Sequence, residues 1–316
     1  MHKKDLYYVT CLFGGATLAL IIGHFIFLAL LENYPLFNSI TLIFLFLSLI
    51  MLAIGLLSKR KSRHFLMAMG WIIFAVYWAT QPEFLYYKED GDIVNAIICI
   101  LGVYFLFYIG YHEYLSYKRN EELNHLTFIA GATFISAFFY FLIDKLPVLS
   151  GALIKMVAEQ TVWVMKAIGY DVATGAISYG KAITVPVYFN GNHSVQLILA
   201  CTGLQSMMIF IGVIAALKGV DWRRRFKAFM LTIPVIYALN IVRNVGVIYG
   251  VEVRNYTFYF MHNVVGKIGS LLVLIILAYL TFEILPELYD NISSLFELPK
   301  RKGPIERVFS KLLRTR

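Results

Sequence analysis

The chain has 316 residues, of which 59% are hydrophobic and only 15% are charged. A soluble domain carries about 25% charged residues, so the composition excludes an ordinary soluble protein. Apolar runs of about 20 residues, the length that crosses the hydrocarbon core of a bilayer as a helix, recur along the chain. The net charge of +9 comes from Lys and Arg residues that lie between these runs. This pattern is typical of topology signals and indicates no nucleic-acid partner.

We predict an all-α polytopic membrane protein with about eight spans. The spans are expected near residues 7–31, 37–57, 65–80, 93–115, 126–143, 195–217, 228–250 and 263–285. Every second connection between them is rich in Lys and Arg, and such connections stay on the cytoplasmic side. Both termini are therefore predicted to be cytoplasmic in a multi-pass protein of the cell membrane.

Four parts follow from this threading. Residues 1–143 form an N-terminal five-helix membrane region, and residues 144–194 form an extracellular segment. Residues 195–285 form a three-helix membrane core, which carries the candidate catalytic residues described below. Residues 286–316 form a basic, partly amphipathic cytoplasmic tail, expected to rest on the inner membrane surface.

The extracellular segment 144–194 combines two patterns. Apolar residues at helical spacing over Gly151–Tyr170, with polar residues between them, predict an amphipathic helix lying in the membrane interface. Residues 176–178 and 183–189 read as two short strands. Asn190-Gly191 is a good turn dipeptide, and a third strand is expected to begin near Ser194. The sequence therefore predicts a small β element outside the membrane.

The three cysteines, Cys11, Cys99 and Cys201, all lie within apolar segments. None has the spacing of a metal site, and none pairs with another in a polar loop. We therefore expect no disulfide scaffold, no metal and no cofactor.

Cys201 lies near the outer end of its predicted span, Arg243 near the outer end of the next, and His262 at the start of the last. Simple threading brings all three to the outer leaflet boundary. An intramembrane arginine is expensive and indicates function by default. A guanidinium close to a thiol favours the thiolate and can hold a developing oxyanion. Thiol, cation and imidazole together are typical of nucleophilic acyl transfer.

Each of these residues also has an ordinary structural interpretation. Cys201 could be a small apolar helix residue, Arg243 a snorkelling anchor, and His262 an interfacial histidine without chemistry. Arg254 is a rival cation and His193 a rival base, so the third catalytic group is either His262 or Arg254.

Two neighbours support a site. Asn240 lies one turn from Arg243 on the same helical face, where it could orient the guanidinium. Gly203 permits close backbone approach beside Cys201.

Cys201-Thr202-Gly203, the later Asn240-x-x-Arg243 box and His262 resemble the exosortase/archaeosortase family over about residues 145–285. The resemblance implies a membrane-embedded, sortase-like cysteine transpeptidase with Cys201, Arg243 and His262 as its catalytic residues. Its partners would be the C-terminal signals of secreted surface proteins, such as S-layer glycoprotein. Such a signal comprises a short motif, a transmembrane helix and a basic end.

The resemblance further implies that the enzyme removes the helix and joins the new carboxyl end to a membrane lipid. A thioester on Cys201 would be the intermediate. Two alternatives stay open. One is a transporter or lipid-binding protein in which Arg243 is an anion site, and the other is a membrane cysteine protease that only hydrolyses.

Overall fold

The computed structural model describes residues 3–30, 34–88, 93–180 and 182–314. It is mostly helical, with a small sheet, which confirms the predicted polytopic all-α class. The chain forms two compact units. One comprises residues 1–134 with 291–316, and the other comprises residues 135–290.

The first unit is a helical bundle. Its helices are α1 (Lys3–Ala29), α2 (Tyr34–Leu57), α3 (Arg63–Ala79), α4 (Pro82–Lys88), α5 (Ile93–Arg119) and the first half of α6 (Asn124–Lys145). Helix α3 packs against α2 and α5, and α1 packs against α3 and α5. Small residues, including Ala16, Ala19 and Ala75, are buried where α1, α3 and α5 meet. Without a hydrophobic force between helices in lipid, such residues stabilise a bundle by letting backbones approach closely.

Residues 291–316 of the C-terminal tail belong to this unit. The expected position of the tail on the inner membrane surface stays a prediction. After α11 (Pro286–Leu295) and the 3₁₀ turn Leu298–Arg301, helix α12 (Pro304–Arg314) packs against α1. Glu306 accepts hydrogen bonds from the hydroxyls of Tyr108 (3.0 Å) and Tyr111 (3.1 Å) on α5. Burial raises the pKa of Glu306, but hydrogen bonds from His112 and Tyr108 outweigh it and hold this pKa below its ordinary value. The tail is thus fixed by specific polar contacts to protein.

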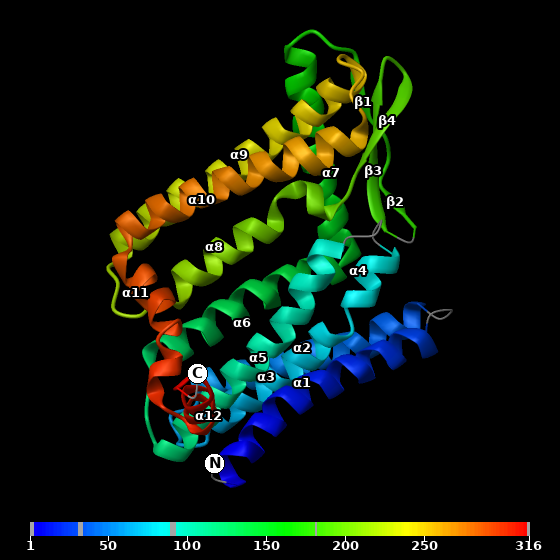
Figure 1. The fold of residues 1–316 in the computed structure, drawn as a ribbon. Helices are drawn as coiled ribbons and strands as arrows, with labels where there is room; N and C mark the ends of the chain where they lie inside the picture. Colours follow the sequence, from blue (N-terminus) through cyan, green and yellow to red (C-terminus); the bar gives the residue numbers. More distant parts are fainter. Residues whose placement is uncertain (1–2, 31–33, 89–92, 181, 315–316) are drawn as a thin grey trace. The chain divides into compact units, whose positions relative to one another are not determined.

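The second unit carries the second half of α6, the sheet and the helices on either side of the sheet in the chain. Helix α7 (Pro147–Ala167) is followed by β1 (Val172–Thr174), β2 (Ser178–Tyr179), β3 (Ile183–Phe189) and β4 (Asn192–Leu197). Strand β3 is central and pairs antiparallel with the other three. The 3₁₀ turn η1 (Leu199–Thr202) then leads into α8 (Leu204–Ala216), α9 (Trp222–Glu252), the π-helical segment η2 (Phe260–Gly266) and α10 (Lys267–Ile284). Figure 1 shows the axes of α8, α9 and α10 roughly aligned, with the chain direction alternating and the sheet beyond one end.

The predicted span at 195–217 is only partly correct. Residues 195–197 belong to β4, and α8 has 13 residues. At 1.5 Å per residue α8 is about 20 Å long, which is shorter than the hydrocarbon core of about 30 Å. Strand β4 and the turn that follows it take up the N-terminal part of this apolar run.

Helix α7, predicted to lie in the interface, is one of eight described helices that are long and apolar enough to span a membrane. Its apolar stripe, which includes Ile154, Ala158 and Met165, is buried in the core beneath the sheet. On the other side Trp163 is 71% exposed. Helix α7 is therefore amphipathic as predicted, but its apolar side packs against strands β1 and β3.

Candidate active site

Cys201 lies in the turn that joins the sheet to the helices. Its N–H donates to the Ile198 carbonyl (2.9 Å), which closes the turn. The Thr202 hydroxyl donates to the Leu199 carbonyl (2.7 Å) and accepts from the Leu204 N–H (3.3 Å), at the start of α8. This turn sets where the cysteine main chain lies.

The carbonyl oxygen of Cys201 is held by two side-chain amides of α9. Asn240 donates to it from Nδ2 at 2.5 Å and Asn244 from Nδ2 at 2.9 Å. Residues four apart share one face of a helix, so both amides can reach one oxygen, and a carbonyl has two lone pairs to accept them. A buried carbonyl left without a partner would cost about 1–3 kcal/mol.

Gly203 allows this approach for two reasons. Its φ of 74° lies in the left-handed region, which a side chain disfavours. A Cβ added there would also stand 3.2 Å from both Cβ and Cγ of Asn240. The glycine expected to permit close approach is therefore the residue against which Asn240 packs.

The thiol side of Cys201 is buried in an apolar cluster under the sheet. The residue is 6% exposed and packs with Ile154, Val195, Leu197 and Ile248, among others. In contrast, Cys11 is exposed on α1, and the Cys99 thiol donates to the Trp78 carbonyl within the first unit. The Cys201 residue is therefore almost fully shielded from solvent in this structure.

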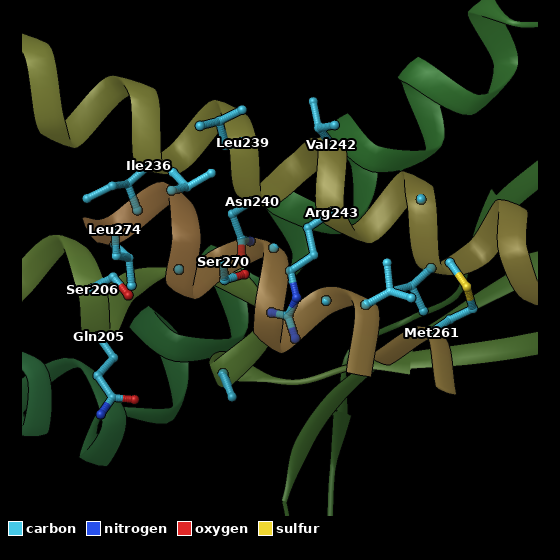
Figure 2. Close-up of a pocket in the computed structure, with 18 residues that line it drawn as sticks. Gln205, Ser206, Ile236, Leu239, Asn240, Val242, Arg243, Met261, Ser270 and Leu274 are labelled. Atoms are coloured by element: carbon cyan, nitrogen blue, oxygen red, sulfur yellow. The ribbon is translucent and has the colours of Figure 1, made fainter. Parts of the chain in front are cut away.

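Arg243 projects from α9 into a pocket of about 350 Å³. Figure 2 shows Asn240 and Arg243 pointing from α9 to the side where α10 lies. The Arg243 Nε is buried and has no hydrogen-bond partner among the residues that the structure describes. Gly266 makes room for it, because a Cβ there would stand 2.9 Å from Nε.

The pocket lies among α8, α9, η2 and α10, and it has no acidic group. Its polar lining residues are Gln205, Ser206, Asn240, Arg243 and Ser270. The rest of the lining is glycine or apolar residues. A single unpaired guanidinium in such surroundings favours a group that carries or develops negative charge.

His262 lies in η2, half-buried, with its ring stacked on Phe258 at 5.0 Å between centroids. Neither Cys201 nor His262 lines the pocket. Burial raises the pKa of the Cys201 thiol, and the charge of Arg243 opposes this shift only in part. Among the described residues, no hydrogen bond joins the Cys201 thiol to the His262 imidazole.

The two rivals lie elsewhere. Arg254 is exposed just beyond the end of α9, and its guanidinium stacks over the Tyr249 ring at 5.6 Å. His193 is exposed on β4, opposite Tyr188 and next to the hairpin turn, at the end of the strand that is remote from Cys201. Among the described residues no group of three or more His, Cys, Asp and Glu could hold a metal ion.

Asn244 is the site residue that the sequence reasoning missed. It was read only as the neighbour of Arg243, while Asn240 was assigned to orient that arginine. The structure directs both amides to the Cys201 carbonyl. The i, i+4 spacing of two buried asparagines on one apolar helix was the available signal.

Most of the chain resembles known proteins. Residues 85–279, more than half of the chain, match the family described as Transmembrane exosortase. The chain is 26% identical over 218 residues to Archaeosortase A of Haloferax volcanii, covering 67% of this chain and 70% of that protein. It is 28% identical over 198 residues to Archaeosortase A of Natronomonas pharaonis, covering 60% and 58%. No solved structure matches.

The Gly203 geometry predicts a contrast between two pocket glycines. Gly203→Ala should destabilise the protein by about 1–3 kcal/mol, because it forces a side chain into left-handed backbone against Asn240. Gly246→Ala on α9 should be neutral or stabilising by up to about 1 kcal/mol, since an added Cβ there meets nothing within 4 Å. Thermal unfolding of the purified variants in detergent measures both. Equal stability of the two variants would contradict the geometry.

Proposed function

The chain belongs to the transmembrane exosortase family, and on that premise we propose that it is a membrane-embedded, sortase-like enzyme that processes surface proteins. The relatives named Archaeosortase A support this assignment. The substrates would be secreted proteins that carry a C-terminal signal made of a short motif, a membrane helix and a basic end. The acceptor would be a membrane lipid.

One observation carries the proposal. The main chain of Cys201 is hydrogen-bonded to the same turn of α9 that presents Arg243, whose Nε is buried without a partner. An unpaired guanidinium near a thiol is what thiol acyl transfer needs, because charge develops on the sulfur and then on the substrate oxygen. The transporter alternative gives Cys201 no role.

The proposed reaction has two halves. The Cys201 thiolate attacks the carbonyl carbon of the scissile peptide, and Arg243 stabilises the resulting oxyanion. The C–N bond then breaks, and the amine of the released helix segment takes up the proton that His262 removed from the thiol. A nucleophilic group of the lipid attacks the thioester, gives its proton to His262, and frees the thiolate as the new bond forms.

We also propose that the site faces the cell exterior and that both termini are cytoplasmic. The support is the alternation of basic connections along the sequence. A substrate helix in the same bilayer would then hold its scissile region at the depth of the site. Such placement reduces the orientational cost of bringing the reacting groups together.

Replacing the nucleophile gives the first test. Cys201→Ala should abolish processing of a substrate protein in cells, whereas Cys11→Ala and Cys99→Ala should process it normally. Mass spectrometry of the product's carboxyl terminus separates the outcomes. A lipid-linked end supports transpeptidation and a free acid indicates a simple protease. Normal processing by Cys201→Ala removes the cysteine mechanism.

The third catalytic group can be identified by paired variants. Arg254 is exposed over Tyr249, so Arg254→Ala should keep most activity. His262→Gln should lose the proton transfer, which contributes about 10²–10⁴-fold to rate, and should flatten the pH–rate profile. Loss of activity in Arg254→Ala alone would reassign the role to Arg254.

Topology can be tested by labelling single cysteines with a membrane-impermeant thiol reagent in a cysteine-free background. Asn192→Cys and Ser310→Cys introduce reactive thiols at exposed positions in the hairpin and the tail. The first should react in intact cells, and the second only after lysis. The opposite pattern would place the site on the cytoplasmic side.

A further inference from the structure

We infer that Asn244 is a positioning residue for the thiol chemistry and that, with Asn240, it fixes the Cys201 main chain relative to Arg243. This inference rests on the proposed function of Cys201. It adds a residue that takes no part in the reaction and touches no substrate.

The geometry starts from one helical turn. Asn240, Arg243 and Asn244 follow within five residues of α9, and the two amides converge on the carbonyl oxygen of Cys201. One hydrogen bond to a carbonyl leaves the peptide free to swing about that bond. A second donor, Asn244, which lies four residues further along the same helix, removes this freedom. The pair of amides, which we call the amide clamp, therefore sets the distance and direction from the Cys201 backbone to the helix that carries Arg243.

The need for such a clamp follows from the local structure. Residues 198–203 link a strand to a helix through a single 3₁₀ turn and a left-handed glycine, so Cys201 lies in a short connection between two longer elements. Catalysis by thiol and guanidinium depends on their separation, and a displacement of about 1 Å can cost about 10²-fold in rate. The clamp adds two hydrogen bonds from α9 to the one that closes the turn.

A variant at Asn244 tests the positioning role more directly than a variant at Asn240, because it leaves the substrate pocket unchanged. Asn240 lines the pocket, so its replacement alters both the clamp and the pocket wall. Asn244 is 5% exposed and does not line the pocket. Changing Asn244 should therefore lower kcat by about 10²-fold and leave KM nearly unchanged, because the pocket surface stays the same.

The decisive variant is Asn244→Asp. It keeps the shape of the side chain, but a carboxylate has no proton to donate, whereas a protonated carboxyl group has one. The ratio of its kcat to the wild-type kcat should rise as the pH falls. Asn244→Ala should show the same loss of rate with a ratio that does not change with pH.

The control is Thr232→Val, which removes another buried polar group of α9 at nearly constant volume. The Thr232 hydroxyl donates only to carbonyls of its own helix, at Ala228 (2.8 Å) and Phe229 (3.3 Å). Its kcat and KM should match those of the wild type. The assay measures processing of a purified substrate protein by the full-length enzyme in lipid nanodiscs, with thermal unfolding of each variant recorded in parallel.

The outcomes separate this inference from the proposed function. Low kcat with normal KM in Asn244→Ala, together with acid recovery of Asn244→Asp, supports the clamp. Wild-type kcat in both Asn244 variants, or a pH-independent ratio in Asn244→Asp, overturns it even if Cys201→Ala is inactive. Full activity of Cys201→Ala would instead overturn the proposed function.

Discussion

The hydrogen bonds from two asparagines to one main-chain carbonyl are the constraint on which the candidate site depends. In a bilayer every backbone polar group must find a partner within the protein, and regular helices meet this condition automatically. The chain departs from helix between β4 and α8, where Cys201 lies. At this departure from regular structure, the amides of Asn240 and Asn244 donate hydrogen bonds to the carbonyl oxygen of Cys201. Gly203 has no side chain and therefore leaves the space that they need. A break in regular structure and the means of stabilising it thus occur together at the proposed nucleophile.

Burial patterns explain which parts of the fold the sequence predicts well. Strand β3 was expected at residues 183–189 and is found there. Alternating residues followed by a clear turn dipeptide indicate a strand and no other element. Strand β1 has only three residues, too few for a period to show, and it was missed. The run at 195–217 was read as one span because lipid and a sheet core favour the same apolar side chains. Only the structure shows that its first residues belong to β4.

The same limit applies to the site. Cys201, Arg243 and Asn240 could be proposed because an intramembrane arginine is costly and because threading suggests which helix ends meet. Residue spacing within one helix does not show which group on another element a side-chain amide will contact. The contacts of both asparagines with Cys201 were therefore not foreseen. The docking of the tail on α5 through Glu306 was missed for a similar reason. Its basic residues suggested a membrane surface. In the structure Glu306 accepts hydrogen bonds from two tyrosines of α5, and the basic Arg301 also donates to the His112 carbonyl of that helix.

The arginines of α9 show where this unit keeps a polar group unsatisfied. Near the start of the helix, Arg224 pairs with Glu287 through two hydrogen bonds, at 2.7 and 2.8 Å, and Arg225 donates to the Ala215 carbonyl at the end of α8. These cations hold elements of the protein together. Arg243, in contrast, keeps a buried Nε without a partner in a pocket that has no acid. A buried unsatisfied donor costs stability and calls for an explanation. An anionic group that forms only during reaction would explain it, because a permanent acidic partner would neutralise the charge that the transition state requires.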